Sequence, residues 1–328
     1  MSRRVLVTGA GGYLGGRIVR ALAVRPDCQV RAGVRRHVPW IEPVEQVIVI
    51  PDDELPNLVT TISGTDALIH LAVPNEIAMS SRPDKELASA LSGARRIAEA
   101  CRRAGVSRIV YASTVHVYGA AMTPGAELTE EVLPAPRDHY AIARLASEYI
   151  ISAAAQSEVE VVILRLTNVV GAPADPAIAR WSLLANDLCR QASTYGVLRL
   201  RTHGMQCRDF LSMADACRLV EAATGLPVEG VAPVPPSTYN GGSGRSMTVR
   251  DLAGLVQDAW ERRSGRRPPL IAPDPPATIP ALWRLSIGRL RSLGFEPSST
   301  IDSALDETVC CCLRASEARA PEGTSWAR

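Results

Sequence analysis

The chain has 328 residues, enough to bury a full hydrophobic core in one large domain or two closely joined domains. Its composition, 46% hydrophobic and 21% charged, is that of an ordinary soluble globular protein, and its formal net charge of +2 gives no electrostatic case for binding nucleic acid or a membrane surface. No apolar run reaches the roughly 18 residues that cross a bilayer. Residues 1–4 lead directly into a strand pattern without room for a signal peptide, so we expect a cytoplasmic protein.

The chain begins with an apolar strand, a glycine-rich turn and an amphipathic helix. Residues 8–15 read TGAGGYLG, the spacing of a dinucleotide-binding turn. Gly9 makes the tight turn, Gly12 lets the backbone approach a pyrophosphate, and Gly15 lets the helix pack closely on the sheet. The amides that begin the helix, at Tyr13 and Leu14, then face the phosphates. The alternative is a purely structural turn, which the flanking strand and helix disfavour.

The first half of the chain alternates short apolar runs with helical patterns. We predict strands over residues 4–8, 29–34, 46–50, 67–71, 108–112 and 160–166, and helices over residues 14–24, 54–63, 86–104 and 140–156. This alternation is typical of a parallel sheet wrapped by crossover helices, and a continuous apolar strand such as 47–50 fits a sheet covered on both faces. The sequence therefore predicts an α/β fold, a doubly wound parallel sheet of the Rossmann type.

After residue 171 the pattern is less regular. We predict a helix over 176–192, a short strand near 197–200, a helix over 213–225, a turn over 239–244 and a helix over 248–264. We assign residues 1–170 to a dinucleotide-binding domain, with elements returning to it from about 208–250. Residues 171–313 form a smaller α/β substrate-binding lobe, and the small, polar and charged residues of 314–328 predict a disordered tail.

The eight cysteines of the chain lack the paired spacing of metal ligands. In a reducing compartment we expect them to be buried small hydrophobic side chains. The run of three cysteines at 310–312 has no histidine near it in sequence, which argues against a metal or redox site. We therefore predict no metal.

Two further segments place polar groups where the same cofactor would lie. Residues 113–119 read STVHVYG and put hydroxyl groups at the C-terminal end of the fifth predicted strand. Ligands of open parallel sheets bind at that edge. Tyr140 and Arg144 lie one turn apart on one face of a predicted helix, so a phenol and a cation can act together.

With these segments the chain resembles the extended short-chain dehydrogenase/reductase family, the nucleotide-sugar epimerases, dehydratases and ketoreductases. The resemblance runs from residue 3 to about 309, with TGAGGYLG at 8–15, ALIHLA at 67–72, STVHVYG at 113–119, YAIAR at 140–144, LRLTNVVG at 164–171, RDFLSMAD at 208–215, YNGGSG at 239–244 and LGFEP at 293–297. It implies that Leu71 and Ala72 contact the cofactor and that Asn168 and Arg208 contact the diphosphate or nucleotide of a nucleotide-sugar substrate. It also implies a homodimer that pairs the helix carrying Tyr140 with helix 86–104.

The resemblance assigns the chemistry to Thr114, Tyr140 and Arg144. Tyr140 would be the acid/base, and Thr114 would hydrogen-bond the substrate oxygen and polarise the carbonyl. A free tyrosine has a pKa of about 10, so a neighbouring cation is needed to favour the phenolate. The family has lysine where this chain has Arg144, which keeps the charge but cannot relay a proton. Either the chain is a working catalyst with an altered site, or it has lost the chemistry and retained binding.

The end of the second predicted strand distinguishes the cofactors. An acid there would hold the ribose of NAD, but this chain has Arg35 and Arg36, which suit a 2′-phosphate. The alternative is a solvated basic turn. Asp52 resembles the residue that meets the adenine amino group, with a plain surface turn as the alternative. We therefore expect NADP(H) to be preferred, with NAD(H) possible.

A preference for NADPH favours net reduction. Within the family the chain most resembles the dTDP-4-keto-6-deoxyhexose 4-ketoreductases of antibiotic pathways, by the arginine pair, by residues 114–115 and by residues 264–276. His116 is expected to contact substrate or donate a proton, or else to pack near the pocket. The other hypotheses are an epimerase or dehydratase that retains NAD, a nucleotide-binding protein without catalysis, and a reductase of a non-sugar ketone.

Overall fold

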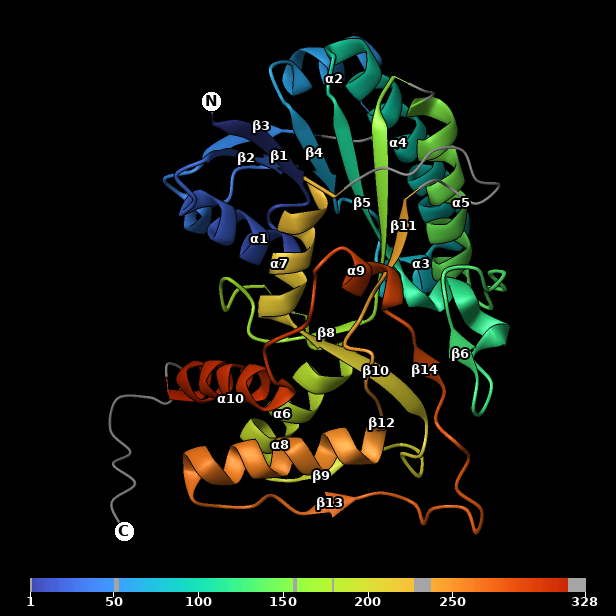
Figure 1. Ribbon diagram of the computed structural model, residues 1–328. Helices are drawn as coiled ribbons and strands as arrows, with labels where there is room; N and C mark the ends of the chain where they lie inside the picture. Colours follow the sequence, from blue (N-terminus) through green and yellow to red (C-terminus); the bar gives the residue numbers. More distant parts are fainter. Residues whose placement is uncertain (1, 50–52, 156–157, 179, 227–236, 318–328) are drawn as a thin grey trace.

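The larger part of the protein is a seven-stranded sheet with the strand order β11-β7-β5-β4-β1-β2-β3, in which every neighbouring pair is parallel (Figure 1). The computed structural model describes residues 2–49, 53–155, 158–178, 180–226 and 237–317. The strands are β1 (Arg3–Thr8), β2 (Cys28–Val34), β3 (Glu45–Ile48), β4 (Ala67–His70), β5 (Arg108–Thr114), β7 (Glu160–Leu166) and β11 (Thr238–Gly241). The strand order reverses between β1 and β4, so the topological switch point lies at the C-terminal ends of these strands.

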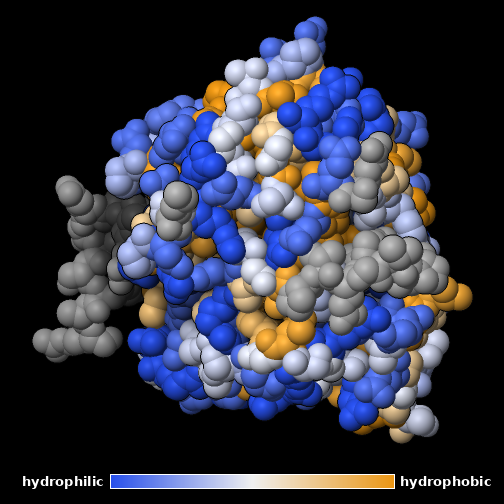
Figure 2. Space-filling view, turned by 45° about the horizontal axis from the view of Figure 1, so that its top comes forward, coloured by the Kyte–Doolittle hydropathy of each residue, from blue (hydrophilic) through white to orange (hydrophobic). Residues whose placement is uncertain are grey.

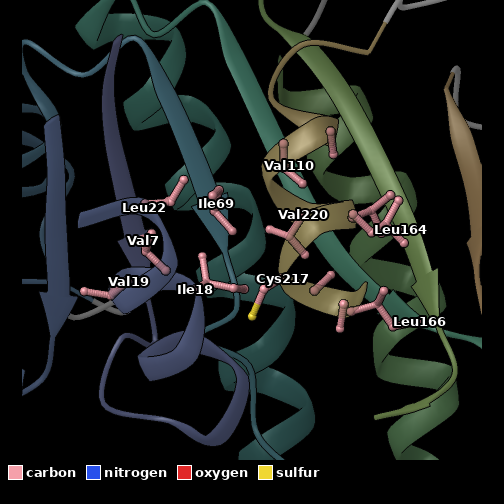
Figure 3. Close-up of a cluster of buried hydrophobic side chains, with 14 of the residues drawn as sticks. Val7, Ile18, Val19, Leu22, Ile69, Val110, Leu164, Leu166, Cys217 and Val220 are labelled. Atoms are coloured by element: carbon pink, nitrogen blue, oxygen red, sulfur yellow. The ribbon is translucent and has the colours of Figure 1, made fainter. Parts of the chain in front are cut away.

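Helices cover both faces of this sheet. On one face lie α1 (Tyr13–Ala23) and α7 (Met213–Ala223), and on the other α2 (Leu55–Ile62), α4 (Pro83–Ala104) and α5 (His139–Ala155). Side chains of β1 alternate between two cores: Val7 packs with α1 and α7 (Figure 3), and Leu6 packs with α2 and α4. Burial of both faces explains why the strands are continuous apolar runs.

A second, smaller unit surrounds a three-stranded sheet with the order β12-β10-β8. Its strands are β8 (Asn168–Val170), β10 (Cys207–Ser212) and β12 (Ser246–Thr248). The helices α6 (Leu184–Tyr195), α8 (Val249–Ser264) and α10 (Ile301–Glu317) share a core with it (Figure 1). A short pair joins β9 (Leu198–Arg199) to β13 (Leu270–Ile271) at the edge of this unit.

Several short elements complete the fold. They are the 3-10 helices η1 (Pro39–Ile41) and η2 (Val115–Ala121), the helices α3 (Glu76–Ser81) and α9 (Gly288–Ser292), and the paired strands β6 (Glu127–Leu128) and β14 (Arg284–Leu285). The helix η2 follows β5 directly, and its Val117 and Tyr118 share a buried cluster with Leu128 on β6 and Leu285 on β14.

The predicted doubly wound α/β fold is confirmed, and the six strands and four helices expected before residue 166 are present. β5 extends to Thr114 rather than ending at residue 112, and α4 begins at Pro83 rather than at residue 86. The helix expected over 213–225 is α7, and the helix expected over 248–264 is α8, which Thr248 and Asp251 begin with a capping box.

Three predictions in the second half are wrong. Residues 239–241 are not part of a turn but belong to β11, a seventh strand of the large sheet that pairs with β7. The helix expected from residue 176 begins only at Leu184, and residues 171–178 and 180–183 form bends, turns and irregular backbone instead. The helix α10 was not predicted, and it continues to Glu317, so residues 314–317 of the disordered tail expected over 314–328 are helical. Residues 318–328 lie outside the described residues.

The burial of Leu305, Val309 and Cys312 against α6 and α8 explains why α10 forms. Cys101, Cys189, Cys217, Cys311 and Cys312 are buried, while Cys28, Cys207 and Cys310 are partly exposed. Within the described residues no group of three or more histidine, cysteine or acidic side chains is arranged to hold a metal, and no helix is long and apolar enough to cross a membrane. Hydrophilic residues cover most of the face seen in Figure 2, interrupted by small hydrophobic patches.

Candidate active site

The glycine turn between β1 and α1 lies at the switch point of the sheet. Gly9 has a φ of +73°, a conformation that a side chain would strain. A Cβ on Gly15 would lie 2.2 Å from the carbonyl oxygen of Gly9, so only glycine lets α1 approach the turn this closely. Gly12 is the N-cap of α1, and no side chain caps the first-turn amides of Tyr13 and Leu14. These amides are therefore left to bind an anion.

The end of β4 closes the other side of the turn. The amides of Leu71 and Ala72 lie 3.2 Å and 3.4 Å from Oγ1 of Thr8, and a Cβ on Gly9 would come within 3.0 Å of the nitrogen of Ala72. Nδ1 of His70 lies 2.8 Å from the same hydroxyl oxygen. Burial, together with the charge of Arg144, lowers the pKa of His70 to about 3, so its ring is neutral and holds the turn in place.

The side chain of Tyr13 does not face this turn. Its phenol is buried and donates to the carbonyl oxygen of Gly171, with Oδ1 of Asn186 on α6 at 3.4 Å. Burial raises the pKa of Tyr13 above its ordinary value. Tyr13 therefore ties α1 to the smaller unit, and only its backbone amide is available to a ligand at the turn.

Arg35 and Arg36 follow β2 and are exposed. Within the described residues, no hydrogen bond or ion pair engages either guanidinium group. The end of β2 lies beside the glycine turn, because the amide of Ala10 donates to the carbonyl oxygen of Gly33 at 3.2 Å. The side chain of Gln46 holds the loop after the arginine pair through both backbone groups of Val38. Asp52 lies outside the described residues.

Tyr140 and Arg144 lie against each other near the end of β5, the strand that Thr114 ends. Thr114 is 5% exposed and accepts a hydrogen bond from the amide of His116 at 3.3 Å. Tyr140 lies in the first turn of α5, which Asp138 caps by accepting from the amide of Ala141 at 2.8 Å. The sequence thus placed the catalytic candidates on the correct elements.

The guanidinium group of Arg144 lies against the ring of Tyr140, with Cζ 5.0 Å from the ring centroid. Its Nη1 donates to the carbonyl oxygen of Ala112 on β5 at 2.9 Å, while its buried Nε has no hydrogen-bond partner in the described residues. Burial opposes the charge on Arg144, but the neighbouring phenol groups of Tyr140 and Tyr111 outweigh this and raise its pKa. Arg144 is therefore a fixed cation beside Tyr140.

A cavity of about 390 Å³ opens beside His116 and Asp138, and Thr114, Tyr140 and Arg144 are not among the residues that line it. Val115, His116 and Asp138 contribute to one wall, Asn168 and Arg208 to a second, and Pro280–Trp283 to a third. The rings of His116 and Tyr140 meet edge to face, with centroids 6.5 Å apart. Burial and the charge of Arg208 lower the pKa of His116, so it is neutral near pH 7 and can hydrogen-bond but not act as a cation.

Asn168 and Arg208 lie on the neighbouring strands β8 and β10. Nδ2 of Asn168 donates to the carbonyl oxygen of Asp209 at 3.0 Å, and Nη1 of Arg208 donates to that of Cys207 at 2.8 Å. Burial lowers the pKa of Arg208, and no carboxylate in the described part of the chain pairs with it. Arg208 is thus a partly buried cation at a cavity wall, which suits an anionic ligand.

Sequence reasoning missed Asp209, which builds this wall. Its carboxylate is buried and accepts from the amides of Ser243 and Arg245 at 2.8 Å and 3.1 Å. A Cβ on Gly242 would lie 2.8 Å from Oδ1 of Asp209, so the glycines of residues 241–244 let the loop close over the carboxylate. Asp209 lies inside the RDFLSMAD segment that carries the family resemblance, and this position was the one sequence feature that could have indicated its role.

Comparisons with known proteins agree with this arrangement. The family model of the NAD dependent epimerase/dehydratase family matches residues 5–240. The chain is 27% identical over 303 residues to a UDP-glucose 4-epimerase of Azospirillum brasilense, covering 83% of this chain and 84% of that protein. It is 28% identical over 264 residues to a GDP-6-deoxy-D-mannose reductase of Pseudomonas aeruginosa, covering 79% and 80%. The solved structure of MoeE5 in complex with UDP-glucuronic acid and NAD has a TM-score of 0.78 at 26% identity, over 95% of this chain and 99% of that one.

Proposed function

Since the chain belongs to the NAD-dependent epimerase/dehydratase family, a family of NAD(P)-dependent enzymes that act on nucleotide sugars, we propose that it is an NADPH-dependent ketoreductase. Its substrate is a nucleotide-linked 4-keto-deoxysugar, with dTDP as the nucleotide, and it serves the biosynthesis of deoxysugars for natural products. The observation that carries the proposal is the pair Arg35 and Arg36, which stands beside the glycine turn without acidic partners in the described residues.

The residues at the switch point fit a dinucleotide phosphate. The uncapped amides of Tyr13 and Leu14 would bind the pyrophosphate, because Gly9, Gly12 and Gly15 leave no Cβ between them and the ligand. Arg35 and Arg36 would bind the 2′-phosphate of NADPH through charge-assisted hydrogen bonds. Leu71 and Ala72 border the same space at the end of β4. Bound NADPH supplies the hydride that reduces the sugar carbonyl.

Tyr140 donates its phenolic proton to the carbonyl oxygen as that oxygen becomes the product hydroxyl, and Thr114 donates a hydrogen bond to the same oxygen. The phenolate left on Tyr140 is stabilised by Arg144, whose guanidinium lies against the ring, until a solvent proton replaces the one transferred. Arg144 does not itself release a proton. Because it is anchored to the carbonyl of Ala112, it acts as a fixed charge.

The cavity between the two units is the proposed substrate site. Arg208 and Asn168 would bind the diphosphate, since Arg208 is a partly buried cation without an acidic partner in the described residues. The keto sugar would then lie between this wall and Tyr140, with neutral His116 hydrogen-bonding to it. The smaller unit thus sets which sugar face meets the cofactor.

The alternative is an epimerase or dehydratase that retains NAD, which the similarity to the UDP-glucose 4-epimerase of Azospirillum brasilense favours. Fluorescence titration of the purified protein with NADPH and NADH, after assay for co-purified nucleotide, separates the two. The ketoreductase proposal predicts at least tenfold tighter binding of NADPH, the equivalent of about 1.4 kcal/mol. Tightly bound NAD, or a preference for NADH, would support the epimerase or dehydratase.

We also propose a homodimer built from α4 and α5. Ile142 and Tyr149 on α5 are 41% and 46% exposed, which leaves apolar surface for a second copy. Light scattering of the wild type should give twice the mass of one chain, and Tyr149→Arg should give a monomer. A wild type that is monomeric at micromolar concentration would contradict this.

A further inference from the structure

A network of buried, hydrogen-bonded polar side chains lies next to the proposed active site. The carboxylate of Glu148 and the guanidinium of Arg165 form an ion pair at 2.8 Å, and both side chains are 0% exposed. Ser113, the residue before Thr114, donates to Oε1 of Glu148, and Nε of Arg165 donates to the same oxygen at 3.2 Å. Burial of such a pair contributes little net stability, because apolar side chains of the same volume fill a core at least as well.

The hydrogen-bond network continues from the ion pair towards the cavity wall. Nη1 of Arg165 donates to the hydroxyl of Tyr118 at 3.2 Å, and that hydroxyl donates to Oδ1 of Asn240 at 2.6 Å. Nδ2 of Asn240 then donates to the carbonyl oxygens of Leu128 and Ser286, both at 3.0 Å. Burial raises the pKa of Tyr118 to about 12, so its hydroxyl keeps the proton that it donates to Asn240.

The elements joined by these bonds are those that carry the proposed reaction. Ser113 adjoins Thr114 at the end of β5, and Glu148 lies on α5, four residues after Arg144. Tyr118 lies on η2, two residues after His116, and Ser286 follows β14, which leads from the cavity wall at Trp283. One connected network thus reaches the proton donor's helix, the strand with Thr114 and the third wall of the cavity.

We propose that this network positions the cavity wall against Thr114 and Tyr140, with the hydroxyl of Tyr118 as the side-chain link between its two halves. The ion pair half fixes β5, α5 and β7 relative to one another. The Asn240 half fixes β6 and β14 relative to β11. The role rests on the proposed function, since it assumes that the cavity binds the substrate sugar. Tyr118 and Glu148 are therefore positioning residues that act through the groups on either side of them.

Tyr118→Phe is the sharpest test, because it removes one hydroxyl and keeps the ring. We expect single-turnover hydride transfer to a dTDP-4-keto-6-deoxyhexose to slow by about tenfold to hundredfold at saturating ligands, the effect of misplacement on the scale of 1 Å. The dissociation constant of NADPH should stay within about twofold, since the glycine turn is untouched. Ser113→Ala, which frees Glu148 from β5, should slow the same step.

The matched control is Thr308→Val, which removes the hydroxyl that donates to the carbonyl of Ala304 at 2.8 Å in the core of α10. It should keep the wild-type transfer rate, because it removes a buried hydroxyl that has no bond to the network. If Tyr118→Phe and Ser113→Ala, measured as folded proteins, transfer hydride at the wild-type rate, the positioning role is wrong.

Amide hydrogen exchange tests the network without turnover. Tyr118→Phe should speed exchange over residues 115–119 and 280–287, and Thr308→Val should not. Unchanged exchange at both segments overturns the network's role even in an inactive protein. A wild type that fails to consume NADPH with a nucleotide keto sugar would instead overturn the proposed function, so the two failures are distinguishable.

Discussion

Replacing Arg144 by lysine asks whether the arginine is a handicap or a fitted part of the site. β4 pairs with β5 only as far as Tyr111, and Arg144 donates to the next carbonyl oxygen along β5, that of Ala112, at 2.9 Å. Ala112 is 7% exposed. Arg144→Lys keeps the charge but replaces the planar guanidinium fork by a single ammonium group. We expect this to weaken the hydrogen bond to Ala112 and to lower the free energy of unfolding by up to about 1–3 kcal/mol.

The same substitution moves the cation away from Tyr140. A desolvated cation on an aromatic ring is worth about 1–2 kcal/mol, so its complete loss from the transition state would lower kcat about 5-fold to 30-fold. The partial loss in Arg144→Lys should therefore lower kcat by less than about 30-fold. Urea unfolding measures the stability of the variant, and NADPH oxidation at saturating keto sugar measures its kcat. Arg144→Met, which also removes the charge, should be slower still.

An Arg144→Lys variant with wild-type stability and a higher kcat would refute this reasoning. It would show that the arginine impairs an ancestral lysine site rather than being held by the sheet. If the wild type were inactive and the lysine variant active, the chain would be a nucleotide-binding protein that has lost its chemistry.

Three further predictions concern the arginine pair, the glycine turn and Asp209. Replacing both Arg35 and Arg36 by serine should weaken NADPH about 10-fold to 100-fold, by loss of charge-assisted hydrogen bonds, and leave NADH unchanged in calorimetry. Equal losses for both nucleotides would contradict a 2′-phosphate site. Gly15→Ala places a Cβ 2.2 Å from the carbonyl oxygen of Gly9 and should abolish NADPH binding. Gly254→Ala, whose new Cβ would meet no other part of the protein within 4 Å beyond its own helix, should bind NADPH normally and gain about 0.5–1 kcal/mol in the free energy of unfolding. Wild-type binding by Gly15→Ala would refute the steric argument. Burial raises the pKa of Asp209 to about 6, above its value of about 3.9 in the unfolded chain, so the native state binds this proton more tightly. The free energy of unfolding should therefore fall by up to about 3 kcal/mol as pH rises from about 4 to about 6. Asp209→Asn should remove that part of the pH dependence in urea unfolding, and an unchanged slope over this window would contradict it.

The features that the sequence predicted well depend on residues close together in the chain. The glycine spacing of residues 8–15 and the turn between Tyr140 and Arg144 are local patterns, and the structure places them at the switch point and on α5. The continuous apolar strands likewise predicted a sheet with both faces covered, as Leu6 and Val7 on opposite cores show. Local geometry is enough to position such residues.

The remainder depends on pairings across long stretches of chain. Residues 239–241 look like a glycine turn, and only pairing with β7 makes them a strand. The phenol of Tyr13 meets Gly171 rather than a ligand, and Arg165 is buried only because Glu148 lies opposite. None of these partners is visible from spacing or hydropathy, because each comes from another element of the fold.

The stoichiometry of NADPH consumption, measured when the protein free of added NAD is mixed with a dTDP-4-keto-6-deoxyhexose, tests the proposed reaction itself. We predict that one NADPH is oxidised for each keto sugar reduced to an alcohol, and that Tyr140→Phe does not catalyse this reduction. Conversion of a nucleotide sugar without net consumption of NADPH, by protein carrying bound NAD, would contradict it.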